Sequence, residues 1–420
     1  MDKFVITGGK KLSGSIEISG AKNASLALMP ACLLTNGVST LQNTPELNDV
    51  YTMMKLLAFL GADVDFQQSI LNINTLDITS FEAPYEHVKK MRASVYVLGP
   101  LLSRYGKAKV SLPGGCAWGP RPINLHLEAL EKMGADIELE SGYIIAKAKR
   151  LSGAKINFDI SSVGATGNTL MAASLAKGET IINNAAMEPE ISNLAEFLVK
   201  MGAKIEGIGT STLEIEGVSE LKPVEVVTIP DRIEAGTLLV GGAITGGSIT
   251  LKKIQSKYLQ AVISKLEDSG CKIKTDKDSI SISRSGEIKP VDVSTSIFPG
   301  FPTDMQAQWI AYMSLSGGVS TVTDTIYLDR FKHVPELIRL GADIKVNENS
   351  AIVKGVERLE GAKVMSTDLR ASASLVLAGL AAKGTTEVLR VYHLDRGYQR
   401  IEEKLKALGA DIKRVPGAEF

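Results

Sequence analysis

A helix-then-strand phrase recurs six times along this chain of 420 residues. In each copy, apolar residues at helical spacing precede a glycine and residues of alternating polarity follow it, as in ALEKMGADIEL ending at Leu139. The six glycines are separated by 73, 68, 68, 71 and 68 residues: Gly61, Gly134, Gly202, Gly270, Gly341 and Gly409. Because 420 residues divided by six copies gives 70, the chain is predicted to consist of six copies of one unit.

The glycine of each phrase fits the left-handed backbone that ends many helices, so the phrase predicts an amphipathic outer helix that turns into a half-buried strand. A second phrase, of small and apolar residues, precedes it in every unit, as in RIEAGTLLVGGAITGG from Arg232 to Gly247. A helix of this composition lacks a broad polar face and is predicted to lie inside a core. Each repeat therefore combines an interior helix, an outer helix and several strands, which predicts a mixed α/β fold.

Six such units exceed the usual size of a single core, which favours two lobes of three repeats each. One lobe is predicted to contain residues 1–20 and 230–420, and the other residues 21–229. The strand-like segment from Phe4 to Ser19 can pair with either lobe. The alternative is one continuous solenoid of six units.

The composition narrows the possible partners. With 47 basic and 47 acidic side chains the chain has no net charge, so no nucleic-acid partner is predicted and an anionic ligand must be held by local Lys and Arg. Cys32, Cys116 and Cys271 are too few and too scattered for a disulfide framework or a zinc site, which favours a reducing cytoplasm. No apolar stretch predicts secretion or a membrane span. Walker A, dinucleotide-binding and HExxH motifs are absent from the sequence, so neither a cofactor nor a metal is predicted.

One segment breaks the repeat pattern. PGGCAWGPRP, from Pro113 to Pro122, contains three prolines and three glycines and is predicted to be a loop. It carries Cys116 five residues before Arg121, and a nearby cation favours the thiolate and attracts anions. A reactive thiol and an ordinary small residue remain equally good interpretations of Cys116 at this point.

Cations recur at the predicted starts of the interior helices: Lys22, Arg92, Arg232 and Arg370. A helix N-terminus carries partial positive charge, so a cation there is unfavourable unless an anion offsets it. The alternatives are extension into solvent or pairing with neighbouring carboxylates such as Asp231 and Asp368. In FPTDMQAQW, Asp304 falls in a first helical turn, either as a partner of the helix dipole or as a base or acceptor for a hydroxyl. These residues alone predict an anion-binding enzyme with two lobes and a loop cysteine.

Eight separated segments, spread over nearly the whole chain, resemble the motifs of one known family. They are SGAKNA around Lys22, MRAS around Arg92, LPGGC ending at Cys116, SVGAT from Ser162 to Thr166, NAAMEPEI from Asn184 to Ile191, FPTDMQAQ around Asp304, TDLRASASLVLAG around Arg370 and HLDRGY around Arg396. In these segments the chain resembles the enolpyruvyl transferases that act on UDP-N-acetylglucosamine. The related enolpyruvylshikimate-phosphate synthases share the two-lobed fold but lack the PGGC loop.

The resemblance implies a two-lobed inside-out α/β barrel, with three repeats per lobe, helices inside and strands outside. It also implies a reaction of peptidoglycan synthesis without metal or cofactor. In that reaction the enolpyruvyl group of phosphoenolpyruvate passes to the 3′-hydroxyl of UDP-N-acetylglucosamine, and phosphate is released through a tetrahedral ketal. Both substrates are small molecules, and no oligomeric state is implied.

The resemblance also implies roles for individual residues. Cys116 is expected to protonate the methylene carbon of phosphoenolpyruvate and to form a covalent adduct with it, and Asp304 to contact the attacking hydroxyl. The residues expected to hold phosphoenolpyruvate are Lys22, Arg121 and Arg396. Those expected to contact the UDP-sugar are Asn23, Arg92, Pro122, Ile123, Asn124, Leu125, Ser162, Val163, Gly164 and Ile326, and Arg330 and Arg370 resemble further cations of the site.

Three positions depart from the family's pattern: Trp118, Asn124 and Ile160. Asn124 stands where an aspartate is common, so the substitution removes a charge near the expected uridine site. Two rival functions remain open at this point. One is an enolpyruvylshikimate-phosphate synthase-like transferase, and the other is a UDP-sugar-binding paralogue with little or no catalytic activity.

Overall fold

The computed structural model describes residues 2–89, 91–112 and 123–417. The chain divides into two compact units, and each is described by itself. The terminal unit contains residues 1–19 and 230–420, and the middle unit contains residues 20–229. Each unit has its own apolar core, because the two clusters of buried side chains do not share a residue.

The described strands form six sheets of four strands each, three sheets in each unit. The sheets of the middle unit have the orders β14-β3-β5-β4, β6-β7-β9-β8 and β10-β11-β13-β12. Their strands are β3 (Val38–Gln42), β4 (Asp63–Gln67), β5 (Ile70–Asn74), β6 (Glu82–Ala83), β7 (Lys107–Ser111), β8 (Asp136–Glu140), β9 (Tyr143–Lys147), β10 (Lys155–Asn157), β11 (Glu179–Asn183), β12 (Lys204–Glu206), β13 (Thr212–Glu216) and β14 (Glu225–Val227).

The sheets of the terminal unit have the orders β16-β17-β15-β2, β18-β19-β21-β20 and β22-β23-β1-β24. Their strands are β1 (Asp2–Thr7), β2 (Ser13–Glu17), β15 (Ser248–Lys252), β16 (Lys272–Thr275), β17 (Ser279–Ser283), β18 (Val293–Ser294), β19 (Val319–Thr323), β20 (Asp343–Asn347), β21 (Ser350–Lys354), β22 (Lys363–Met365), β23 (Thr385–Leu389) and β24 (Asp411–Pro416). In all six sheets one outer strand pairs in parallel with its neighbour, and the other two pairings are antiparallel.

The interior helices begin each repeat. They are α1 (Lys22–Ala31) with η1 (Cys32–Leu34), η2 (Arg92–Val97) with α4 (Leu98–Tyr105), α6 (Val163–Ala173), α8 (Arg232–Ile244), η4 (Thr303–Met305) with α10 (Gln306–Met313), and α12 (Leu369–Ala381). The outer helices are α2 (Asn48–Phe59), α5 (Asn124–Lys132), α7 (Pro189–Met201), α9 (Gln260–Asp268), α11 (Val334–Arg339) and α13 (Ile401–Ala407). Shorter segments are α3 (Tyr85–Val88), η3 (Ser256–Tyr258) and η5 (Val391–Arg396).

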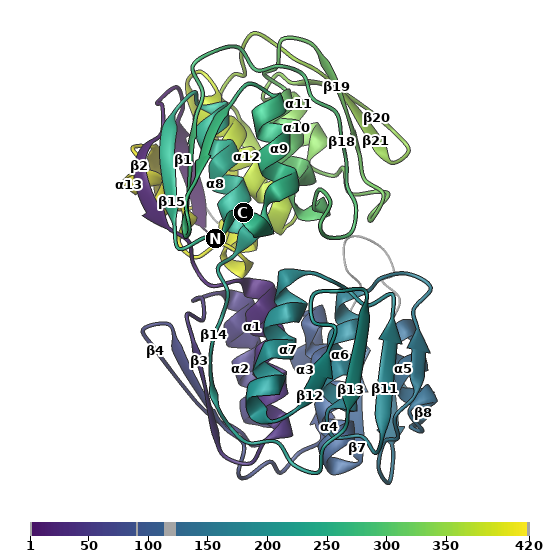
Figure 1. Cartoon of the computed structure of the whole chain (residues 1–420). Helices are drawn as coiled ribbons and strands as arrows, with labels where there is room; N and C mark the ends of the chain where they lie inside the picture. Colours follow the sequence, from purple (N-terminus) through teal and green to yellow (C-terminus); the bar gives the residue numbers. More distant parts are fainter. Residues whose placement is uncertain (1, 90, 113–122, 418–420) are drawn as a thin grey trace. The chain divides into compact units, whose positions relative to one another are not determined.

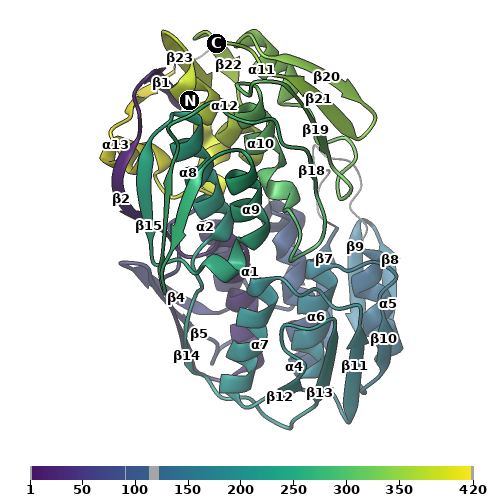
Figure 2. The ribbon, with the colours of Figure 1, turned by 45° about the horizontal axis from the view of Figure 1, so that its top comes forward.

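The interior helices are buried on every side, as their sequence predicts. All eight residues of α10 are buried, and in α8 every residue after Arg232 is buried. Figures 1 and 2 show α8, α10 and α12 enclosed by the strands and outer helices of their unit. The mixed α/β fold built from six repeats is therefore confirmed.

The six phrase glycines all adopt a positive φ, between 91° and 112°. At Gly61 the left-handed backbone also meets a crowded surface, because a Cβ would lie 2.5 Å from the Asp77 carbonyl oxygen. The predicted helix-ending glycine is thus confirmed in every repeat.

The N-terminal strands complete sheets whose other strands come from the second half of the chain. β1 pairs with β23 and β24, and β2 pairs with β15, so the segment from Phe4 to Ser19 joins the terminal unit. Figure 1 shows these purple strands beside the teal β15 and the yellow α13. In the middle unit, β14 follows the third repeat and closes the sheet of the first.

Candidate active site

Asp304, Arg330 and Arg370 meet in the terminal unit. Asp304 lies in η4, at the start of an interior helix, and Arg370 is the second residue of another, α12. One carboxylate oxygen of Asp304 lies 2.9 Å from Arg330 Nη2, and the other accepts a hydrogen bond of 3.0 Å from Arg370 Nη2. Arg330 Nη1 also donates to Thr303 Oγ1 at 3.0 Å. Both oxygens of the carboxylate are therefore engaged by guanidinium groups.

The two arginines of this cluster are more deeply buried than the carboxylate that they share. The side chains of Arg330 and Arg370 are 8% and 4% exposed, whereas that of Asp304 is 26% exposed. Burial alone would raise the pKa of Asp304, but the charges and hydrogen bonds of Arg370 and Arg330 outweigh it and hold the pKa well below its usual range. The two arginines therefore favour the ionised form of Asp304, and each of its carboxylate oxygens already contacts one of them.

A layer of buried polar side chains lies beneath Arg370. Its guanidinium carbon is 5.3 Å from the centre of the Tyr398 ring. The Tyr398 hydroxyl contacts Thr237 Oγ1 at 2.9 Å and accepts a hydrogen bond of 3.2 Å from Gln308. Arg370 Nη1 is buried without a hydrogen-bond partner among the described residues. An anionic ligand can accept a hydrogen bond from an unpaired donor of this kind on a charged group.

Two further predicted residues of the terminal unit lie outside this cluster of ion pairs. Arg396 ends η5, and its charge contributes to lowering the pKa of His393, after the larger effect of burial. Ile326 donates its N–H to Asp324 at 2.9 Å, in the turn after β19. No described hydrogen bond or ion pair joins either residue to Asp304.

In the middle unit, Lys22 opens α1 and pairs with Asp49 of α2. Its Nζ lies 3.0 Å from Asp49 Oδ2, and the two side chains are 13% and 5% exposed. The next residue, Asn23, is exposed. A buried carboxylate thus holds the Lys22 ammonium at the N-terminus of an interior helix. Its negative charge offsets the repulsion between the ammonium and the positive end of the helix dipole.

The starts of η2, α5 and α6 converge around His126. Burial, followed by the charge of Arg92 at the start of η2, lowers the pKa of His126 to about 4. A Cβ built on Gly164, in the first turn of α6, would lie 2.9 Å from His126 Nε2. Because the glycine has no Cβ, the imidazole can pack directly against the start of α6.

The other predicted residues of the middle unit lie on the same two helices. Ser162 caps α6, its Oγ accepting a hydrogen bond of 3.3 Å from the N–H of Ala165. Asn124 starts α5 and donates to Glu128 at 3.1 Å, while Leu125 is buried. The structure therefore brings together the starts of α5 and α6, with the predicted residues Ile123, Asn124, Leu125, Ser162, Val163 and Gly164. Ile160, one of the three departures, is 62% exposed.

Four residues singled out in the sequence lie outside the described residues: Cys116, Trp118, Arg121 and Pro122. Their expected roles remain predictions.

The cations at the starts of the interior helices have different partners. Lys22 and Arg370 pair with Asp49 and Asp304. Arg232 lies over the Phe298 ring, with its guanidinium carbon 5.6 Å from the ring centre. Asp231 and Asp368, which the sequence suggested as partners of such cations, accept hydrogen bonds from the backbone N–H groups of the first turns of α8 and α12. Arg92 begins a 3-10 helix rather than the α-helix expected there.

Sequence reasoning missed Asp49, His126 and Asn168. Asp49 sits in an outer helix with no distinguishing motif, and His126 follows the predicted segment that ends at Leu125. Asn168 is one of several polar residues in an otherwise apolar helix. A buried amide in an interior helix is the one signal that the sequence offered, because such a group requires partners.

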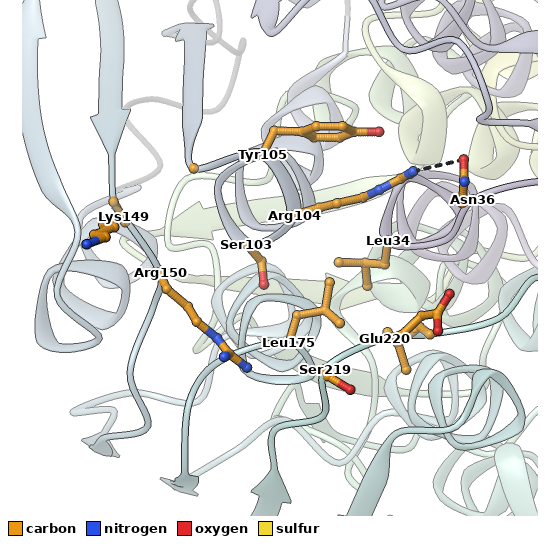
Figure 3. Close-up of a pocket in the computed structure, with 13 residues that line it drawn as sticks. Leu34, Asn36, Ser103, Arg104, Tyr105, Lys149, Arg150, Leu175, Ser219 and Glu220 are labelled. Carbon is orange, nitrogen blue, oxygen red and sulfur yellow. Dashed lines mark hydrogen bonds between the residues drawn. The ribbon is translucent and has the colours of Figure 1, made fainter.

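A cavity of about 580 Å³ opens in the middle unit, at the ends of the interior helices opposite to Lys22, Arg92 and Ser162. It is lined by the last residues of η1 and α4 and by residues beyond α6: Leu34, Asn36, Ser103, Arg104, Tyr105, Gly106, Ala148, Lys149, Arg150, Leu175, Ser219, Glu220 and Leu221. Arg104 donates hydrogen bonds to the carbonyl oxygens of Leu33 and Thr35. It also donates to the Asn36 side chain, as Figure 3 shows. It therefore caps the end of a helix, and none of the predicted site residues lines this cavity.

The described residues contain no group of three or more His, Cys, Asp or Glu side chains arranged to hold a metal ion. In residues 2–89, 91–112 and 123–417, no helix has both the length and the apolar character that a membrane span requires.

Comparison with known proteins places this geometry in a family. The family model for EPSP synthase (3-phosphoshikimate 1-carboxyvinyltransferase) matches residues 6–405. The chain is 61% identical to the UDP-N-acetylglucosamine 1-carboxyvinyltransferase of Chloroherpeton thalassium, covering 100% of this chain and 99% of that protein. It is 57% identical to the protein of the same name from Chlorobaculum parvum, over 100% of both chains.

Solved structures show the same fold. The enolpyruvyl transferase NikO from Streptomyces tendae superposes with a TM-score of 0.90 at 24% identity, covering 99% of both chains. The EPSP synthase from Acinetobacter baumannii superposes with a TM-score of 0.76 at 18% identity, covering 99% of this chain and 100% of that one. The fold and the family model define an enolpyruvyl transferase. Within that class, the chain belongs to the family of UDP-N-acetylglucosamine 1-carboxyvinyltransferases.

Proposed function

We propose that this enzyme transfers the enolpyruvyl group of phosphoenolpyruvate to the 3′-hydroxyl of UDP-N-acetylglucosamine and releases phosphate, as a step of peptidoglycan synthesis. The observation that carries the proposal is identity of 57–61% over the whole chain with proteins named for this activity. Identity over the full length covers both units, and therefore every segment predicted to contact a substrate.

The proposed chemistry is an addition followed by an elimination. Cys116 delivers a proton to the methylene carbon of phosphoenolpyruvate while the sugar oxygen bonds to its C2 and the hydroxyl proton leaves for a base. The resulting tetrahedral ketal then loses a proton from the methyl group and expels phosphate, which restores the double bond. The sum is one enolpyruvyl ether and one phosphate, without any change of oxidation state.

Asp304 is the proposed contact of the attacking hydroxyl, and its ion pairs restrict when it can act. With each carboxylate oxygen held by Arg330 or Arg370, Asp304 is a weak base in this arrangement. A substrate anion that binds the same guanidinium groups would compete with the carboxylate and free one oxygen for the hydroxyl proton. Substrate binding would thus activate the base, and the unpaired Nη1 of Arg370 supports an anion at this position.

The other cations fit electrostatic stabilisation of the same reaction. Lys22, Arg121 and Arg396 are proposed to bind the phosphate and carboxylate of phosphoenolpyruvate, and Arg92 the nucleotide sugar. Both substrates are anions that repel each other in water, so fixed cations lower the free energy of bringing them together. The pairing of Lys22 with Asp49, at 3.0 Å, orients that ammonium.

The test is phosphate release from phosphoenolpyruvate with either of two acceptors. We expect release with UDP-N-acetylglucosamine and none with shikimate 3-phosphate. Release with shikimate 3-phosphate alone would contradict the proposal in favour of the related synthase. Binding of the UDP-sugar without phosphate release would identify a silent sugar-binding protein.

A variant of the loop cysteine tests the proposed acid. Cys116→Ala should abolish phosphate release and also resist alkylation by fosfomycin, because both need the thiol. Cys32→Ala is the matched control, since burial raises the pKa of Cys32 to about 12 and keeps that thiol protonated. Unchanged turnover in Cys116→Ala would remove the acid role from this residue.

A further inference from the structure

Arg414 breaks the pattern of the six repeats. It lies five residues after the glycine of the sixth helix-then-strand phrase. The equivalent residues of the other five phrases are all uncharged: Phe66, Leu139, Gly207, Thr275 and Val346. Positions that serve the common scaffold are expected to recur in every repeat, so a cation in one copy alone indicates a role of its own.

Carboxylates engage all three nitrogens of the Arg414 guanidinium. Nη1 and Nη2 donate to the two oxygens of Asp395 at 3.0 and 2.6 Å, which makes a bidentate ion pair. Nε donates to Glu402 at 2.7 Å, and Nη1 also lies 3.4 Å from an Asp2 oxygen. The guanidinium carbon is 5.0 Å from the centre of the fully buried Phe4 ring. A planar group held on this many sides keeps one orientation, unlike the cation of a single exposed ion pair.

The ion pairs of Arg414 join three successive elements of the chain. Arg414 belongs to β24, Asp395 to η5 and Glu402 to α13. Asp395 directly precedes Arg396, the last residue of η5. Because consecutive Cα atoms are about 3.8 Å apart, a fixed Asp395 determines where the Arg396 side chain begins.

The residues after Arg396 are anchored against the start of α12. A Cβ added to Gly397 would lie 2.6 Å from Leu369 Cδ2, so this backbone packs directly on the first residue of α12. The next residue, Tyr398, has its ring centre 5.3 Å from the guanidinium carbon of Arg370. Arg396 therefore lies between two anchored segments, one of which contacts the arginine that binds Asp304.

We propose that Arg414 is a positioning residue for Arg396: it fixes Asp395, and through that backbone it directs the Arg396 guanidinium at phosphoenolpyruvate. The inference rests on the proposed function for the ligand of Arg396, and on the geometry for the role of Arg414. A guanidinium group binds a carboxylate or phosphate through parallel hydrogen bonds, whose geometry tolerates little displacement. A loosened backbone at Arg396 therefore weakens the binding of phosphoenolpyruvate, although Arg414 acts on that ligand only through Arg396.

The test compares variants of the full chain by steady-state kinetics and by calorimetric titration with phosphoenolpyruvate alone. Arg414→Lys keeps the charge but loses the bidentate geometry, and Asp395→Asn removes the carboxylate that Arg414 holds. We expect each variant to raise KM and Kd for phosphoenolpyruvate by about 10- to 100-fold. The KM for UDP-N-acetylglucosamine should stay at the wild-type value in both. Asp395→Asn, at a partly exposed residue, decides the test if Arg414→Lys does not fold.

Glu402→Gln is the matched control, because it alters the other half of the same set of ion pairs. Its carboxylate contacts Arg414 from α13 and has no direct link to η5. We expect this variant to lower Tm and to bind phosphoenolpyruvate like wild type, since the bidentate pair with Asp395 remains.

A double-mutant cycle separates positioning from a merely structural role. Arg396→Ala removes the group through which Arg414 is proposed to act. In that background Arg414→Lys should weaken phosphoenolpyruvate binding no further, whereas additive losses would overturn the proposal.

The remaining contrary outcomes each have one meaning. Unchanged affinity for phosphoenolpyruvate in both Arg414→Lys and Asp395→Asn would overturn the proposal, as would equal losses for the two substrates or an equal loss in Glu402→Gln. If wild type binds phosphoenolpyruvate but releases no phosphate with UDP-N-acetylglucosamine, and Arg414→Lys weakens that binding, the proposed function fails while the positioning role stands. If wild type does not bind phosphoenolpyruvate, both fail.

Discussion

Replacing Asp304 by asparagine isolates the charge that holds Arg330 and Arg370. The substitution keeps the size of the side chain but leaves two guanidinium groups, both less than a tenth exposed, without a counter-ion. Breaking a buried ion pair costs about 3–5 kcal/mol. The carboxylate is a quarter exposed and the amide still accepts one hydrogen bond, so we expect the lower end, about 3 kcal/mol of the free energy of unfolding.

The assay is scanning calorimetry with and without phosphate. For a unit of about 200 residues, a loss of about 3 kcal/mol lowers Tm by roughly 6–12 °C. If Asp304 occupies the place of a substrate anion, phosphate should bind the vacated arginines and raise the Tm of the variant more than that of wild type. At a phosphate concentration 100 times Kd, the recovery is about 2.7 kcal/mol.

Asp329→Asn is the matched control, because it removes an exposed carboxylate next to Arg330 in the sequence. We expect it to change neither Tm nor the response to phosphate. An Asp304→Asn protein as stable as wild type, with no additional response to phosphate, would refute the account of this cluster.

Three further predictions concern histidine burial, helix packing and capping. Burial holds the pKa of His126 at about 4 and that of His333 at about 3, below the unfolded value of 6.5. The unfolded chain therefore binds more protons as pH falls from 6.5 towards 4, so the free energy of unfolding should fall by up to about 1.4 kcal/mol per pH unit for each histidine. A Tm that stays constant over this pH range would contradict the burial of these two histidines. Gly164→Ala should lower affinity for the UDP-sugar in titration, because the new Cβ displaces His126 Nε2; wild-type affinity would exclude that contact. Asp368→Ala should remove the cap of α12 and cost about 1 kcal/mol in calorimetry, with Asp368→Asn recovering most of it; equal losses in both variants would assign the effect to charge instead.

The repeat pattern predicted the fold well because local signals repeat in it. A glycine that requires positive φ and a helix without a polar face are both properties of short segments, and six copies of each make the interpretation secure. The sequence grouped residues 1–20 with residues 230–420 but left the strand pairing of the N-terminal segment open. That β1 and β2 complete sheets in the terminal unit depends on contacts between residues more than 200 positions apart.

The candidate site was predicted less completely, for a related reason. Asp304, Arg330 and Arg370 were each singled out, but their separation of up to 66 residues hides the fact that one carboxylate serves both arginines. The sequence suggested Asp304 as a partner of the helix dipole or as a base, and neither interpretation included its contacts with two arginines. His126 carries no local signal and Asn168 only that of an amide in an otherwise apolar helix, because their significance lies in a hydrogen bond across 42 residues.

The most direct test of the proposed enolpyruvyl transfer is the stoichiometry of the reaction. It is measured by mass spectrometry of the nucleotide sugar together with an assay of released phosphate. We expect one phosphate released for each UDP-N-acetylglucosamine that gains an enolpyruvyl group, and neither event with the 3′-deoxy analogue of the sugar. Phosphate released without enolpyruvyl transfer, or transfer that persists with the 3′-deoxy sugar, would contradict the account.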